Sequence, residues 1–199
     1  MICGLYRPSS GQILLDGVDI CEYNQKEYRK LLAPVFQDFR LFAALVEDNI
    51  ALNGISDRSE INAKLKKYGM YNKIMNLRAG LKNELLKEFD EEGYQPSGGE
   101  GQKLALVRAD YRDVPFIILD EPTAALDPEA EYSLYKDVRE NMEDKTIIFV
   151  SHRMSLCKFC DRIIVLSEGK IVEEGNHEEL IKNKGLYSRM FEAQAENYC

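Results

Sequence analysis

The chain has 199 residues, of which 45% are hydrophobic and 30% are charged, and its formal net charge is −8 with a pI near 5.0. This length and composition fit one globular domain that can bury a substantial core. The acidic balance disfavours direct binding to nucleic acid or to an anionic membrane surface, because both select clustered Lys and Arg side chains.

The first 37 residues predict a β-hairpin, a short helix and a strand. Ile13-Leu14-Leu15 and Val18-Asp19-Ile20 flank Asp16-Gly17, a dipeptide favoured in tight hairpin turns. Residues 25–32 have the pattern of a short helix. Pro34-Val35-Phe36 predicts a brief strand that leads into Gln37.

The next stretch, from residue 47 to about residue 90, has a helical and polar pattern. Asp57 and Ser59 are suited to cap helices, and apolar residues recur at helical spacing at Ile61, Leu65, Tyr68 and Met70. A further helix is expected to follow Ser97-Gly98-Gly99 and to run to about Arg112. These residues predict an all-helical insertion.

A strand, a helix and a second strand are predicted after this insertion. Residues 114–119 are apolar, as in a strand buried on both faces of a parallel sheet. Asp127-Pro128-Glu129 combines an N-cap carboxylate with a proline at the first helical position, and the helix should run to about Met142. The second strand, residues 146–150, ends in Ser151-His152. Such a crossover unit brings the carboxyl ends of both strands to one edge of the sheet.

The last 40 residues predict a second hairpin and closing helices. Residues 162–166 and 170–173 form the hairpin strands, and Asn176 with Glu179 resembles a capping box. Together the pattern predicts an α/β fold with a parallel sheet, small antiparallel hairpins and a helical insertion.

The sequence contains no apolar run close to the roughly 18 residues that span a bilayer. Arg7 and Pro8 stand where a signal peptide would place its apolar stretch. We therefore expect a cytosolic chain that reaches a membrane only through a partner.

The five cysteines are odd in number and scattered, which does not suggest a disulfide framework. Cys157 and Cys160 form a C-x-x-C pair. A zinc site would need a second pair or two nearby histidines, and the only histidines are His152 and His177, so metal or redox use is disfavoured.

Three polar residues are expected at the carboxyl edge of the sheet, namely Asp120, Glu121 and His152. An aspartate that closes an apolar strand is suited to hold Mg²⁺, and the following glutamate to orient or deprotonate a water molecule. His152 could hydrogen-bond a γ-phosphate. Each feature alone also fits a polar strand exit or an ordinary loop histidine, but their matching positions favour a nucleotide site.

The segment Ser97-Gly98-Gly99-Glu100 opens a predicted helix. Its backbone N–H groups and the positive end of the helix dipole suit a phosphate, and the glycines permit close approach. Glycine-rich turns are common before helices, so the strength of this indication lies in its position directly upstream of the strand at 114–119.

Five segments in this order resemble the motifs of ABC-transporter ATPase domains: Gln37, Ser97 to Glu100, residues 116–121, residues 124–127 and His152. The resemblance covers essentially the whole chain. It implies a single ABC ATPase domain with a P-loop NTPase (RecA-like) core at residues 1–37 and 113–199. Residues 38–112 would then be the helical subdomain that carries the family signature.

The resemblance also implies roles for individual residues. Gln37, Glu121 and His152 would be catalytic, and Asp120 and Gln37 would contact Mg²⁺. The residues implied to contact ATP are Asp120, Ser97, Gly98, Gly99, Glu100 and Asp127, the last of which would communicate across a dimer of ATPase domains.

Residues 88–93 resemble the acidic coupling segment of exporters, which favours export over import. The implied cofactors are ATP and Mg²⁺. The implied partners are a transmembrane domain and a second ABC ATPase domain, identical or different, and not nucleic acid. The chain would lie at the cytoplasmic face of the membrane, with Phe39 and Phe42 near the groove for a membrane partner's helix.

The sequence departs from the family most clearly in lacking the phosphate loop G-x-x-x-x-G-K-[ST]. The chain resembles the family from just past that loop, and the adenine-stacking aromatic residue of the opening strands is also missing. We expect the missing strand to lie beside the strand at 114–119, which would leave an apolar sheet edge and lower stability. Pro96 replaces the usual leucine, and Asp110 stands where an apolar residue is common.

Three functional hypotheses remain open from the sequence. The first is the ATPase domain of an ABC exporter whose sequence begins late. The second is a non-catalytic module that donates only its signature to ATP held by a partner. The third, a soluble ABC-type ATPase of DNA repair or translation, is disfavoured because neither long coiled coils nor a duplicated ATPase domain is present.

Overall fold

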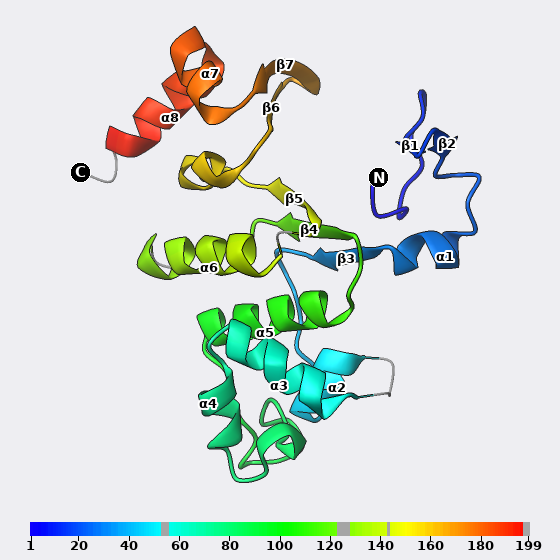
Figure 1. Cartoon of the computed structure of the whole chain (residues 1–199), viewed down its shortest axis with the longest axis vertical. Helices are drawn as coiled ribbons and strands as arrows, with labels where there is room; N and C mark the ends of the chain where they lie inside the picture. Colours follow the sequence, from blue (N-terminus) through cyan, green and yellow to red (C-terminus); the bar gives the residue numbers. More distant parts are fainter. Residues whose placement is uncertain (53–55, 123–127, 143, 197–199) are drawn as a thin grey trace. The chain divides into compact units, whose positions relative to one another are not determined.

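The computed structural model describes residues 1–52, 56–122, 128–142 and 144–196. The chain separates into two compact units, Met1–Val150 and Ser151–Cys199. Both combine helices with strands, so the α/β class expected from the sequence is confirmed (Figure 1). Asp127, expected to contact ATP, lies outside the described residues.

The first unit begins with the expected hairpin, formed by β1 (Leu14–Leu15) and β2 (Val18–Asp19) in antiparallel register. The turn residues Asp16 and Gly17 have φ angles of 51° and 83°. A two-residue turn with positive φ at both positions matches the twist of paired strands, and this explains why an Asp-Gly pair stands here.

Helix α1 (Gln25–Lys30) and strand β3 (Leu32–Val35) follow. The Asn24 side chain caps α1 by accepting hydrogen bonds from the backbone N–H groups of Lys26 and Glu27. The helix ends two residues earlier, and the strand starts two residues earlier, than the sequence suggested. Pro34 is tolerated within β3 because the strand pairs with only one neighbour in the described sheet, and proline has no N–H to offer on the other side.

The central sheet contains three parallel strands in the order β3, β4 (Phe116–Asp120) and β5 (Thr146–Val150). Helix α6 (Pro128–Asn141) forms the crossover between β4 and β5. The expectation that a missing strand belongs beside the strand at 114–119 is wrong, because β4 is paired on both sides. In the described part of the sheet the outer edges belong to β3 and β5, and the apolar β5 is only half-buried.

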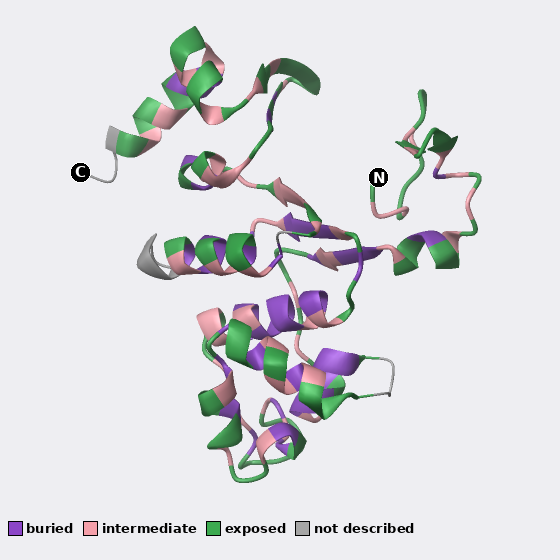
Figure 2. Cartoon of the chain, viewed as in Figure 1, coloured by how far each residue is buried: buried purple, intermediate pink, exposed green. Residues whose placement is uncertain are grey.

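The helical region of this unit contains α2 (Val46–Ala51), α3 (Arg58–Lys67), α4 (Tyr71–Met75), the 3₁₀ turn η1 (Gly80–Lys82) and α5 (Gly98–Tyr111). Helix α5 packs against α2, α3 and β3, and Figure 2 shows buried residues concentrated along it. The apolar residues expected to face the core are buried: Ile61, Leu65, Tyr68 and Met70.

The expectation of helix up to about residue 90 is wrong, because the described chain is irregular between η1 and α5. Here the backbone folds back on itself, with the Leu86 N–H donating to the Tyr94 carbonyl and the Tyr94 N–H donating to the Glu84 carbonyl. Gly93 lies so close to the Leu86 carbonyl that an added methyl group would be 2.0 Å from its oxygen. The backbone N–H groups of Leu86 and Tyr94 are thus paired across the fold-back and not along a helix, and at Gly93 the fold-back has room only for glycine.

Asp110, on α5, occupies a position where an apolar residue was expected. Its carboxylate is 1% exposed and lies 2.9 Å from the Lys64 ammonium and 3.8 Å from that of Lys67, both on α3. The apparent polar mismatch is therefore an ion pair between two packed helices.

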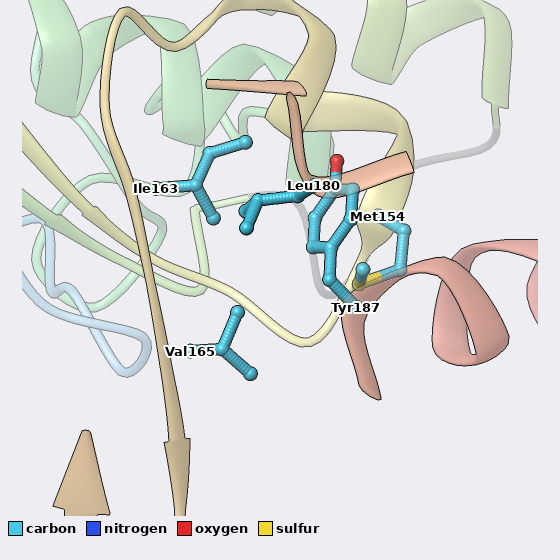
Figure 3. Packing of buried hydrophobic residues seen from close by; sticks show 5 residues of the cluster. All are labelled: Met154, Ile163, Val165, Leu180 and Tyr187. Atoms are coloured by element: carbon cyan, nitrogen blue, oxygen red, sulfur yellow. The ribbon is translucent and has the colours of Figure 1, made fainter. Parts of the chain in front are cut away.

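The second unit contains the 3₁₀ helix η2 (Met154–Phe159), the hairpin of β6 (Ile163–Ser167) and β7 (Lys170–Gly175), and helices α7 (His177–Asn183) and α8 (Leu186–Glu196). The expected hairpin and the Asn176–Glu179 capping box are both confirmed. Five side chains from these elements form its core, as Figure 3 shows: Met154, Ile163, Val165, Leu180 and Tyr187.

A carboxylate joins the hairpin to the last helix of this unit. Glu173, on β7, accepts hydrogen bonds from the N–H groups of Leu186 and Tyr187 at 2.5 and 3.0 Å. These groups belong to the first turn of α8, where no intrahelical acceptor exists. A methyl group added at Gly185 would lie 2.0 Å from a Glu173 oxygen, so a side chain here would displace this carboxylate.

Within the described ranges, none of the helices is both long and apolar enough to cross a membrane.

Candidate functional site

The carboxyl edge of the central sheet brings together three of the predicted site residues. Gln37 follows β3 by two positions, Asp120 ends β4 and Glu121 comes next. The Gln37 Nε2 atom donates a hydrogen bond to Glu121 Oε2 at 2.7 Å. Two side chains 84 positions apart in the sequence are thus joined where parallel strands end, which is where ligands bind in open α/β sheets.

The backbone fixes the direction in which Glu121 leaves the sheet. Its N–H donates to the Val150 carbonyl at 2.8 Å, which extends the β4–β5 ladder by one bond. Its φ angle is 45°, in the left-handed region that a glutamate seldom adopts. Strained backbone of this kind is concentrated at functional sites, and here it turns the carboxylate toward Gln37.

Cys3 is a neighbour of this edge that the sequence did not single out. Burial raises the pKa of the Cys3 thiol, the chain's N-terminal ammonium lowers it, and the Asp120 carboxylate raises it further. The N-terminal segment therefore lies close enough to β4 for its groups to sense the Asp120 charge.

His152 belongs to the second unit, Ser151–Cys199. Its side chain is exposed, and its carbonyl accepts a hydrogen bond from the Gln194 amide. The same Gln194 side chain accepts from the Met154 N–H at 2.9 Å. Residues 152–154 are thereby tied to α8 within their own unit.

The Gly-rich segment forms the capped N-terminus of α5. The Ser97 hydroxyl accepts from the Glu100 N–H at 3.3 Å, and the Glu100 carboxylate accepts from the Ser97 N–H at 2.8 Å. This reciprocal pair is a capping box. An added methyl group at Gly98 would meet nothing within 4 Å, so the first turn of α5 is open to a ligand at this position.

Two further side chains surround the Glu100 carboxylate, and neither was predicted. The Lys73 ammonium, from α4, lies 3.1 Å from Glu100 Oε1, and the buried Tyr94 hydroxyl lies beside the carboxylate. Burial alone raises the pKa of Glu100, but the Ser97 N–H, Lys73 and Tyr94 together lower it to about 2. The same burial and the neighbouring carboxylate raise the pKa of Tyr94.

The segment that follows Gln37 is held by a buried amide and a guanidinium. The Asn49 side chain accepts from the Phe42 N–H and donates to the carbonyls of Phe42, Ala44 and Leu45. Arg108, on α5, donates to Asn49 and to the Arg40 carbonyl. Residues 38–45 are therefore fixed to α5, the helix that Ser97 caps.

Two aromatic side chains of this segment differ in their surroundings. The Phe39 ring packs over Gly101, where an added methyl group would lie 3.5 Å from it. Phe42 is 53% exposed, and the Arg108 guanidinium lies 5.3 Å from its ring centre. Of the two, Phe42 presents the larger aromatic surface to solvent.

Comparisons with known proteins agree on one family. A family model described as ABC transporter matches residues 1–124. The chain is 37% identical over 189 residues to an ATP-dependent lipid A-core flippase of Burkholderia orbicola, a match that covers 95% of this chain and 31% of the relative. It is 38% identical over 206 residues to the subtilin transport ATP-binding protein SpaT of Bacillus subtilis, with 100% and 32% coverage.

Among solved structures, a bacterial Atm1-family ABC exporter with ATP bound matches with a TM-score of 0.85 and 33% sequence identity. The match covers 98% of this chain and 33% of that chain. The chain thus spans about a third of the length of the relatives that it matches.

Proposed function

We propose, on the premise that this chain belongs to the ABC transporter family, that it is the ATP-binding domain of an exporter and couples ATP hydrolysis to translocation of a substrate. The family hydrolyses ATP, and the relatives with the quoted identities are named as a lipid A-core flippase, a subtilin transport ATP-binding protein and an ABC exporter. Cargo selection would lie with a membrane-spanning partner.

The observation that carries this proposal is the hydrogen bond between Gln37 and Glu121 at the carboxyl edge of the sheet. Glu121 is proposed to orient or deprotonate the water that attacks the γ-phosphate. Gln37 holds its carboxylate in place. His152 is proposed to contact the γ-phosphate, and Asp127 to act across a dimer of ATPase domains.

Mg²⁺ is proposed to be bound through Asp120 and Gln37. This ion prefers oxygen ligands and retains waters and phosphate oxygens around it. The Gln37 amide donates its N–H to Glu121, which makes its carbonyl oxygen the atom suited to the metal. These two oxygen-bearing side chains would hold the ion as part of its ligand set, and the phosphates of ATP would supply further oxygen ligands.

The chain is proposed to form one ABC ATPase domain, with residues 1–37 and 113–199 as the RecA-like core and residues 38–112 as the helical subdomain. Its partners would be a transmembrane domain and a second ATPase domain. Phe42, exposed within the firmly held segment 38–45, supports a contact with the transmembrane partner. Membrane association would occur through that partner, at the cytoplasmic face, and no nucleic acid is involved.

A second candidate function is supported by a different observation. The signature at Ser97 is fully capped, and the first turn of α5 is open at Gly98. Such a chain would complete the binding site for ATP held on a partner's phosphate loop, without hydrolysing ATP itself. The partner's nucleotide would lie against the N–H groups at the start of α5.

Two substitutions in the complex purified with its partners separate these functions. Ser97→Arg blocks the open turn at α5 and should lower ATP hydrolysis about 100-fold under both. Glu121→Gln removes the base and should lower it at least about 100-fold only if this chain is catalytic. Exposed Ser10→Arg and Glu22→Gln are the matched controls. Full activity in the Ser97→Arg complex would refute both functions.

A further inference from the structure

A negatively charged side chain stands at the entrance of the proposed phosphate contact. Glu100 is the third residue of α5, and its carboxylate reaches back to the Ser97 N–H at 2.8 Å. A carboxylate at a helix N-terminus is favourable for the helix, because it faces the positive end of the dipole. The same charge opposes a phosphate that approaches the same helix end.

A lysine side chain lies against this carboxylate. Lys73 Nζ lies 3.1 Å from Glu100 Oε1, while the other oxygen, Oε2, accepts from Ser97. The Glu100 side chain is 26% exposed, so water screens this pair only in part. Lys73 comes from α4, and no sequence motif links it to the signature.

An aromatic residue completes the arrangement. The Tyr94 hydroxyl oxygen is buried and makes no hydrogen bond to a described residue, but it lies near enough to Glu100 for their charges to interact, and the Lys73 ammonium lies 6.0 Å from the centre of the Tyr94 ring. Tyr94 is fixed by backbone hydrogen bonds to Glu84 and Leu86. One lysine and one tyrosine, from two separate segments, thus converge on one carboxylate.

We propose that Lys73, held beside the Tyr94 ring, is a positioning residue for the signature: it holds the Glu100 carboxylate on the Ser97 N–H and offsets its charge, so that the first turn of α5 can receive phosphate. This inference rests on the proposed contact between the signature and ATP on a partner. Lys73 does not touch ATP. Its effect reaches the nucleotide through Glu100.

A double-mutant cycle in the purified complex tests this inference. Lys73→Gln alone leaves the Glu100 charge unopposed and should raise the KM for ATP about fivefold, the effect of about 1 kcal/mol expected for a partly buried ion pair. Glu100→Gln retains the capping box without the charge. In the Glu100→Gln background, Lys73→Gln should change the KM less than about twofold. Exposed Lys87→Gln is the matched control.

A measurement on the chain without partners separates positioning from the proposed function. NMR titration of the Glu100 carboxyl should give a pKa of about 2 in the wild type and a higher value in Lys73→Gln. An unchanged pKa would overturn the inference, as would an equal KM increase in both Glu100 backgrounds. If instead Ser97→Arg leaves ATP hydrolysis intact, the proposed function fails and the inference falls with it.

Discussion

The Nε2 atom of Gln37 lies 2.7 Å from Oε2 of Glu121, so a residue that follows β3 holds the carboxylate that follows β4. The two strands pair directly and in parallel, which fixes the spacing between their ends. Movement of the Gln37 segment would therefore be transmitted to the Glu121 carboxylate without passing through any other side chain.

Removal of this hydrogen bond should impair the chemical step. If this chain is catalytic, Gln37→Ala should lower the kcat for ATP hydrolysis of the complex about 10- to 100-fold, because Glu121 loses its orienting donor. Steady-state ATPase assays measure the effect, with exposed Gln95→Ala as control. Equal activity of both variants would contradict the role assigned to Gln37.

The ion pair between Lys64 and Asp110 should be important for stability. Lys64→Met leaves the buried Asp110 carboxylate with Lys67 at 3.8 Å, which should cost about 2–3 kcal/mol in the free energy of unfolding. Lys136→Met removes an exposed pair with Glu140 and should cost less than about 0.5 kcal/mol. Urea unfolding measures both. A Lys64→Met/Asp110→Leu double variant should recover most of the loss, and failure to recover would argue against a charge effect.

Asn49 should hold the segment that follows Gln37. Asn49→Ala leaves the Phe42 N–H without its acceptor, while the three carbonyl groups each keep a backbone N–H partner, and we expect a loss of about 2 kcal/mol in the free energy of unfolding. The exposed Asn72→Ala should change stability by less than about 0.5 kcal/mol. Hydrogen exchange should show a loss of protection at the Phe42 amide in the first variant only.

Glu100 should make stability depend on acid pH. Its folded-state pKa, about 2, lies below the ordinary value of 4.5, so its stabilising contribution is complete above pH 4.5 and is lost as the pH falls toward 2. We expect the wild type to lose about 1–2 kcal/mol more than Glu100→Gln over this range, after allowance for solvent screening. Urea unfolding at stepped pH provides the comparison with an exposed Glu22→Gln control. Parallel losses in wild type and Glu100→Gln would contradict the expectation.

Substitutions at Phe42 and Phe39 should distinguish association with the membrane partner from the stability of the fold. Phe42 is exposed, so Phe42→Ala should weaken co-purification with the membrane partner while changing stability by less than about 1 kcal/mol. Phe39 packs on α5 at Gly101, so Phe39→Ala should destabilise the chain by about 2 kcal/mol. Unchanged co-purification of Phe42→Ala would exclude this contact.

Features determined by neighbouring residues could be predicted from the sequence. The turn at Asp16-Gly17 and the capping box at Asn176 depend on side chains within three positions of one another. Features that depend on distant pairing could not. The position of β4 between β3 and β5 is a property of parallel strands that meet across the helical insertion, and no local pattern specifies it.

The same distinction between locally determined and distant features applies to the candidate site. The strand ends at Gln37, Asp120 and Glu121 follow from motif order, and the structure adds that Gln37 and Glu121 touch. Lys73 and Tyr94 could not be recognised as site residues from the sequence, because a lysine on a polar helix and a tyrosine in an irregular segment are both common. Their meeting at Glu100 requires the fold of residues 71–100.

The Glu173 carboxylate couples the pairing of β6 and β7 to the capping of α8. Successive side chains of a strand point to opposite faces, so a slip of one residue between β6 and β7 would turn Glu173 away from α8. The N–H groups of Leu186 and Tyr187 would then lose their acceptor, and Gly185 would face an empty space. A misaligned hairpin therefore leaves the last helix uncapped, and the correct alignment is selected by a contact outside the hairpin itself.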